Sequence, residues 1–133
     1  MPGRILLVTN IVIALFAGEK PIRERLAECP EVFLSSTVLG KLYYGALKSS
    51  QAGANCARIE ELAAAATVLP CDATTARLYV EIKASLRLKG RPIPENDIRI
   101  AAVAQQYGLS LATRDEHFNP DSEIKEHCSV PIR

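Results

Sequence analysis

The stretch DIRIAAVAQQYGLSLAT (residues 97–113) decides the fold. Its first part places apolar residues at helical spacing, and Gly108 is a residue type that commonly ends a helix. Residues 109–113 (LSLAT) then predict a short buried strand. A helix that leads directly into a strand is typical of α/β proteins, in which the two kinds of element alternate.

The same alternation extends outward over the rest of the chain. Strands are predicted at 4–8, 32–35, 67–69 and 109–113, and helices at 10–17, 21–28, 36–48, 54–66, 72–89 and 97–107. Candidate helix caps are Asn10, Ser36 or Thr37, and Asp72 or Thr74. Leu47 and Leu88 are assigned to inward faces of their helices. The tail from Phe118 predicts no element.

These elements predict an α/β protein of three layers, with a mainly parallel central sheet flanked by helices. A length of 133 residues favours a single domain, residues 1–133. The formal net charge is only +1, so no overall field points to nucleic acid or membrane. The four cysteines form no C-x-x-C pair, so a zinc site is not predicted, and we expect reduced, buried thiols in a cytoplasmic protein.

The N-terminal segment allows two interpretations. Arg4 followed by ILLVTNIVIALFAG has the charge and apolar core of a signal peptide, although it is shorter than the ~20 apolar residues that span a membrane. Alternatively, it is a buried strand followed by a helix. The polar pair Thr9-Asn10 interrupts the apolar run, and this favours the strand and helix.

Polar side chains gather where predicted strands end. Thr9-Asn10 follows the first strand, Asp97 begins a helix, and Thr113-Arg114-Asp115 follows a late strand. Sites in open α/β sheets lie at the carboxyl ends of strands, and converging carboxylates suit Mg²⁺. Each residue also has an ordinary interpretation: Asp97 as a helix N-terminal acid, Asp115 as a turn residue and Asn10 as a cap. Spacing alone does not identify a nuclease.

Four longer stretches resemble a known family in order, spacing and flanking residues. They are LLVTNIVIALFAGE (6–19), STVLGKLYYGALKS (36–49), LPCDATTARLYVEIKASLRLKGRPIPENDIRIAAVAQQYGL (69–109) and LATRDEHF (111–118). Together they make the chain similar to the VapC-type PIN-domain ribonuclease toxins of bacterial toxin–antitoxin pairs. The resemblance implies a metal-dependent endoribonuclease, a homodimer, a VapB-like antitoxin partner and an RNA substrate.

The resemblance also implies a set of four acidic positions that hold Mg²⁺ or Mn²⁺. Two match Asp97 and Asp115, whereas the other two hold Val8 and Lys41 in this chain. Asn10, Thr9 and Thr113 are implied to support this site. Thr9, Lys48 and Arg114 are expected to contact RNA. Arg99 stands where many relatives have Trp.

Replacing two of four acids changes the charge of the site. Four carboxylates give about −4, whereas two carboxylates and one ammonium give about −1. We therefore expect weakened metal binding, impaired catalysis and an ion pair of Lys41 with Asp97 and Asp115. The replacements are consistent with a decayed gene or with a toxin disarmed during cloning. Two alternatives stay open: an inactive PIN module that binds antitoxin or RNA without turnover, and an unrelated doubly wound protein. The absence of phosphate-binding loop motifs argues against the latter.

Overall fold

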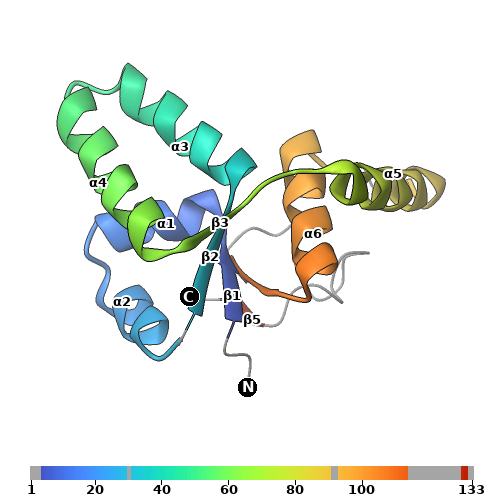
Figure 1. The fold of residues 1–133 in the computed structure, drawn as a ribbon, viewed down its shortest axis with the longest axis horizontal. Helices are drawn as coiled ribbons and strands as arrows, with labels where there is room; N and C mark the ends of the chain where they lie inside the picture. Colours follow the sequence, from blue (N-terminus) through green and yellow to red (C-terminus); the bar gives the residue numbers. More distant parts are fainter. Residues whose placement is uncertain (1–3, 30, 91–92, 114–129, 132–133) are drawn as a thin grey trace.

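The computed structural model describes residues 4–29, 31–90, 93–113 and 130–131, and its centre is a parallel β-sheet (Figure 1). The sheet has five strands in the order β3-β2-β1-β4-β5. Their bounds are β1 Arg4–Leu7, β2 Glu31–Ser35, β3 Thr67–Leu69, β4 Ser110–Thr113 and β5 Val130–Pro131. Every pairing is parallel, which confirms the predicted fold class.

The strands are short apolar runs because helices cover both faces of the sheet. Leu6 of β1 pairs with Phe33 on one side and with Leu111 on the other, and all three side chains are buried. This register places the central strand in the core of the molecule.

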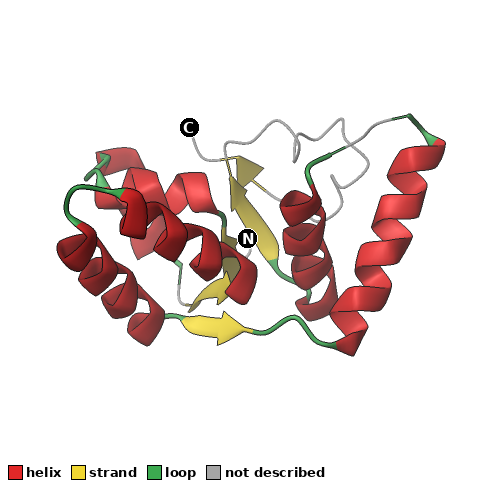
Figure 2. Cartoon of the chain, turned by 90° about the horizontal axis from the view of Figure 1, so that it is seen from above, coloured by secondary structure: helices red, strands yellow, loops and turns green. Residues whose placement is uncertain are grey.

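Two groups of helices flank the sheet (Figure 2). One group is α1 Thr9–Phe16, α2 Lys20–Ala27, α3 Ser36–Lys48 and α4 Ala52–Ala65. The other group is α5 Ala73–Leu88 and α6 Glu95–Tyr107. Within each group neighbouring helices pack together, α3 against α4 and α5 against α6. The result is the predicted three-layer arrangement.

Helix α6 is the most deeply buried helix of the described part of the chain. Its central run Ala101–Ala104 is at most 1% exposed. Small side chains here let the helix axis approach the sheet closely, and a helix that is apolar on nearly all sides must be surrounded by protein. Gly108 ends the helix with a left-handed backbone at φ +63°, as predicted for a helix C-terminus.

Of the three predicted helix caps, one is confirmed. Asp72 caps α5 as predicted, in a reciprocal pair of hydrogen bonds with Thr75. Helix α3 is capped by Ser35, whose Oγ accepts from the Val38 N–H at 3.1 Å, rather than by Ser36 or Thr37. Helix α6 begins at Glu95 after Pro94, two residues before Asp97.

Two leucines and the cysteines correct the predicted burial. Leu47 is 71% exposed and Leu88 is 89% exposed, because both lie near helix ends that project past the core. Cys29, Cys56 and Cys71 are free thiols as predicted, but none is buried and Cys71 is exposed; Cys128 lies outside the described residues. Among the described residues, no helix is both long and apolar enough to cross a membrane.

Candidate active site

The strand order reverses between β1 and β4. From β1 the chain builds outward through β2 and β3, and it then returns to place β4 on the other side of β1. The Val8 N–H donates to the Ala112 carbonyl at 3.4 Å, so the residues that end these two strands lie side by side. Ligands of open parallel sheets bind at such a reversal, outside the carboxyl ends of the strands.

A cleft of about 250 Å³ opens at this place. It is lined by Val8, Thr9, Asn10, Ile13, Lys41, Asp97 and Ile100. These residues come from the end of β1, from α1, from α3 and from α6. The fold therefore brings together seven residues that lie up to ninety-two positions apart in the sequence, among them Thr9, Asn10 and Asp97 of the predicted site.

Asn10 is not a helix cap, which corrects that interpretation. Helix α1 begins at Thr9, so Val8 holds the capping position and provides no side-chain hydrogen bond. Thr9 Oγ1 and Asn10 Oδ1 are both buried, and neither has a hydrogen-bond partner among the described residues. Buried polar atoms are nearly always paired, so two unpaired ones beside a cleft are unusual.

Asp97 fits both of its interpretations. It is the third residue of α6, where the helix dipole favours an acid, and its side chain lines the cleft while being only 7% exposed. Its N–H donates to the Pro94 carbonyl at 3.0 Å, which fixes it in the first helical turn. It is the one carboxylate among the described residues that line this cleft.

Lys41 also lines the cleft, from α3, and is exposed. The expected ion pair with Asp97 is not formed: within the described part of the chain, the ion pairs join Arg4 to Glu31, Lys20 to Glu24 and Lys83 to Glu95. Lys41 and Asp97 therefore line the same cleft without forming an ion pair. Asp115, the other predicted partner, lies outside the described residues.

The remaining predicted residues divide into two groups. Lys48 lies at the end of α3, with its Nζ 4.4 Å from the centroid of the Tyr44 ring, and it does not line the cleft. Thr113 is the last residue of β4, at the edge of the sheet where the cleft opens. The side chain of Thr113 and the whole of Arg114 lie outside what the structure describes.

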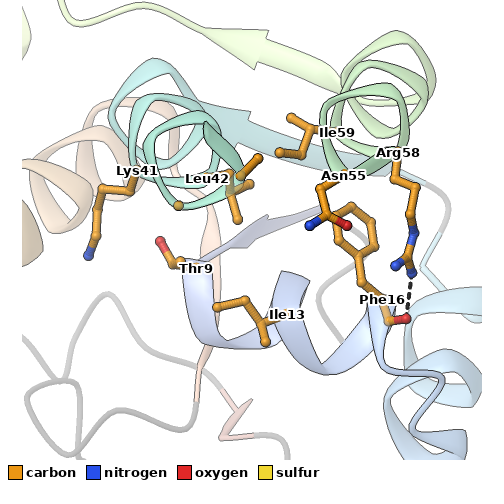
Figure 3. A pocket seen from close by; sticks show the side chains of 10 residues that line it. Thr9, Ile13, Phe16, Lys41, Leu42, Asn55, Arg58 and Ile59 are labelled. Atoms are coloured by element: carbon orange, nitrogen blue, oxygen red, sulfur yellow. Dashed lines mark hydrogen bonds between the residues drawn. The ribbon is translucent and has the colours of Figure 1, made fainter. Parts of the chain in front are cut away.

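A second pocket of about 320 Å³ adjoins the cleft and shares Thr9, Ile13 and Lys41 with it (Figure 3). Its other walls include Asn55 and Arg58 of α4, neither of which the sequence had singled out. Arg58 donates a hydrogen bond to the Phe16 carbonyl at the end of α1. The sequence signal for Arg58 was an arginine within an alanine-rich helix. Its hydrogen-bond partner could not be predicted, because Phe16 lies forty-two residues away.

Arg99, at the family's Trp position, faces away from the cleft toward α5. Its guanidinium donates to Asn96 Oδ1 at 2.9 Å and lies 5.3 Å from the centroid of the Tyr79 ring. The same ring carries a hydroxyl that is hydrogen-bonded to Glu95, which also pairs with Lys83 at 2.5 Å. Arg99 therefore belongs to a polar cluster that joins α5 to α6.

The described residues do not fit the four-carboxylate metal centre that the sequence resemblance implies. Val8 has no ligand atom, and the Lys41 ammonium is a cation that carries no lone pair for a metal. Among the described residues, a divalent cation in this cleft would meet one carboxylate, Asp97, and would be repelled by Lys41. Two of the four positions therefore oppose such a centre.

Comparison with known proteins identifies the family of the chain. The PIN domain family matches residues 5–120. Ribonuclease VapC2 of Haemophilus influenzae is 36% identical over 114 residues, which cover 84% of this chain and 86% of the relative. The tRNA(fMet)-specific endonuclease VapC of Shigella flexneri is 34% identical with the same two coverages. The chain belongs to the VapC-type PIN-domain family.

Solved structures of this family have the same fold. The VapBC2 complex of Rickettsia felis, bound to a promoter DNA fragment, superposes with a TM-score of 0.82 at 25% identity. The match covers 91% of this chain and 94% of that one. The DNA-bound VapBC complex of Salmonella typhimurium gives a TM-score of 0.78 at 30% identity, over 87% and 88% of the two chains. These VapC-type structures are toxin–antitoxin complexes.

Proposed function

We propose that this chain is the toxin component of a VapBC-type pair, an endoribonuclease in its architecture that binds RNA in the cleft at the ends of β1 and β4. We further propose that its hydrolytic step is impaired. Relatives named as ribonucleases at 34–36% identity support the first part. The composition of the cleft supports the second.

The observation that carries the proposal is that Val8, Lys41 and Asp97 line one cleft. The three residues come from different parts of the chain, and all three match acidic positions of the family. Their meeting in one cleft supports the family alignment. Impairment is supported by the residues present, since Asp97 remains as a carboxylate whereas Val8 and Lys41 supply none.

Impairment follows from the charge of the cleft. In the family, Mg²⁺ or Mn²⁺ would supply an activated water and stabilise charge on the scissile phosphate. Restoring Asp at position 8 and Glu at position 41 would make the cleft more negative by three charges. The present residues therefore bind a divalent cation more weakly, and hydrolysis slows with it. Asp97 and Thr9 still shape the place where a phosphodiester would lie.

The proposed partners follow from the relatives. A VapB-like antitoxin is proposed because structural neighbours are VapBC complexes. A homodimer, and an RNA substrate met in the cytoplasm and contacted through Thr9, Lys48 and Arg114, complete the proposal. If the antitoxin inserts an arginine toward the cleft, Lys41 repels it, so Lys41→Glu should tighten binding of a cognate antitoxin peptide.

Cleavage of RNA tests the proposal directly. Labelled initiator tRNA and a structured messenger RNA are incubated with Mn²⁺ or with EDTA, using this chain and the Val8→Asp/Lys41→Glu double variant. The double variant should cleave in Mn²⁺ and not in EDTA, and the parent should be slower by about a hundredfold or more, the scale of a lost catalytic group. Equal cleavage rates for the two proteins would contradict the proposed impairment. If neither protein cleaves any RNA tried, the nuclease assignment is wrong.

A second candidate function is an inactive PIN module that binds antitoxin or RNA without turnover. The same two replacements at positions 8 and 41 favour it. It differs from the first in one outcome: the parent would bind RNA or antitoxin tightly and would show no cleavage in Mn²⁺, even at protein concentrations well above those of the RNA.

A further inference from the structure

The cleft holds charges that suit an anion better than a cation. Its described charged side chains are one carboxylate, Asp97, and one ammonium, Lys41, so they cancel. The net charge of the described part of the cleft then depends on the partial charges of the backbone. Because the position that would cap α1 holds Val8, the N-terminus of that helix lacks both a side-chain cap and an acid in its first turn.

An uncapped helix N-terminus carries about half a positive charge on its free N–H groups. Val8, Thr9 and Asn10, the residues that start α1, all line the cleft, so this partial charge faces into it. An aspartate at position 8 would have cancelled it. The described part of the cleft is therefore slightly positive, whereas three carboxylates at positions 8, 41 and 97 would have made it strongly negative.

Two buried polar atoms, one each from Thr9 and Asn10, lie beside the cleft. The Thr9 hydroxyl has no partner among the described residues and can donate to an anionic oxygen. Asn10 Oδ1 is equally unpaired, and the oxygen and nitrogen of an amide exchange places on rotation, so the NH₂ group can take that position. Both residues line the cleft.

Lys41 provides the charged contact. Figure 3 shows its side chain extended from α3 past Thr9, and within the described part of the chain it makes no ion pair. Phosphate oxygens and an ammonium form strong, charge-assisted hydrogen bonds. A cleft lined by an ammonium without a described ion pair, by an unpaired hydroxyl and by a helix N-terminus is suited to bind a phosphate group.

We propose that Lys41 takes the place of the divalent cation in this cleft, so that the chain binds the phosphodiester of RNA without Mg²⁺ or Mn²⁺. Lys41 and the Thr9 hydroxyl hold the phosphate against the start of α1. Because a fixed ammonium replaces an exchangeable ion, RNA affinity does not depend on divalent metal. The inference rests on the proposed function only in taking RNA as the source of the phosphate.

The test is fluorescence anisotropy of fluorescein-labelled initiator tRNA with the purified chain, in EDTA and in MgCl₂ at matched ionic strength. The parent should bind in both, with dissociation constants within about twofold. Lys41→Glu should weaken binding in EDTA by about tenfold or more, and Mg²⁺ should restore part of the loss, because positions 41 and 97 then hold two carboxylates.

Two further variants make the result specific. Lys20→Glu makes the same change of charge at an exposed lysine of α2, away from the cleft, and should leave affinity within about twofold of the parent. Lys41→Gln removes the ammonium without adding an acid, so it should weaken binding in EDTA without gaining a response to Mg²⁺. It also gives an answer should Lys41→Glu not fold.

Four results would overturn the proposal. The first three are a parent that binds RNA only with Mg²⁺, a Lys41→Gln variant that binds as tightly as the parent in EDTA, and equal losses of affinity for Lys20→Glu and Lys41→Glu. A parent that binds no RNA in either buffer also ends it. The nuclease assignment is decided separately, since a Val8→Asp/Lys41→Glu variant that cleaves RNA keeps that assignment whatever the parent binds.

Discussion

Arg58 of α4 donates a hydrogen bond to the carbonyl of Phe16, the last residue of α1, and its guanidinium lies 4.4 Å from the centroid of the Phe16 ring. Figure 3 shows this contact at one end of the pocket that adjoins the cleft. The carbonyls at a helix C-terminus are unsatisfied and partially negative, so a cation there both pairs and stabilises them. One side chain thus fixes α4 against the helix that begins at the cleft.

Arg58→Ala should therefore lower the free energy of unfolding by about 1 kcal/mol, the scale of one cation–aromatic contact with a charged hydrogen bond at an exposed position. Urea unfolding followed by circular dichroism measures the change. Arg58→Lys keeps the charge but loses the planar stack, and it should fall between the parent and the alanine variant. An unchanged stability for Arg58→Ala would show that the contact adds nothing.

The sequence predicted elements better than it predicted their ends. Alternating apolar runs fixed the order of strands and helices, because burial on both faces of a parallel sheet demands such runs. A predicted helix cap was wrong where a neighbouring residue caps the helix instead, as Ser35 does for α3. Leu47 and Leu88 fit a helical period, yet a period says which side of a helix a residue is on and not whether the core extends that far.

Three predicted site residues line the cleft, but the contacts they make could not be predicted. Polar residues after strands pointed to Thr9, Asn10 and Asp97, since strand ends share one edge of the sheet. Whether Lys41 forms an ion pair with Asp97 depends on where α3 lies relative to α6, and no local sequence pattern encodes this. Arg58 was missed for the same reason, because its partner Phe16 is distant in sequence.

The cluster on α5 and α6 predicts a response to acid. The hydrogen bond from Lys83 holds the pKa of Glu95 below its usual range, and the Tyr79 hydroxyl adds to this. A carboxyl whose pKa is lower in the folded chain stabilises the fold above its unfolded pKa of about 4.3. That contribution is lost as the pH falls through the folded pKa.

Glu95→Gln should therefore be less stable than the parent near neutral pH, and the difference should shrink as the pH falls below about 4. Urea midpoints across this range measure it. Glu60→Gln, a change at an exposed position of α4, is the matched control. A difference between parent and Glu95→Gln that stays constant with pH would contradict the assigned role of the ionised carboxyl.

Lys48 predicts a change in the salt dependence of RNA binding. If it contacts a phosphate, Lys48→Ala should reduce the slope of log affinity against log salt by about 1 and should weaken binding of different RNAs to a similar extent. Anisotropy titrations over a range of NaCl concentrations give the slope, with Lys20→Ala as the control. An unchanged slope would leave Lys48 as a surface residue that packs on Tyr44.

Thr9→Val separates stability from binding. Valine has nearly the shape of threonine and removes a buried hydroxyl that has no partner among the described residues. Its unfolding free energy should rise by up to about 1 kcal/mol, because the desolvation cost of the hydroxyl disappears. Affinity for labelled tRNA in EDTA should fall several-fold at the same time. Loss of stability would instead reveal a partner for the hydroxyl, and unchanged affinity would remove Thr9 from the RNA contact.

Val8→Asp should cost stability even though it restores an acid of the family. Val8 is only 4% exposed, so a carboxylate there loses hydration and lies near Asp97 in the same cleft. The cost should be about 1–3 kcal/mol, with part offset because aspartate is a good cap for α1. Chemical unfolding of the single variant at neutral pH measures the sum.

Metal should recover that loss only when both acids are present. With Asp at 8, Glu at 41 and Asp97, three carboxylates meet at one cleft, and a cation that binds the folded chain stabilises it by mass action. Mn²⁺ should therefore raise the unfolding midpoint of the double variant far more than that of the parent, with EDTA as reference and Lys20→Glu as control. An equal rise in the unfolding midpoint of the parent would mean that Asp97, together with residues outside the described ranges, already binds the ion. Lys41 would then have to swing out of the cleft to admit it.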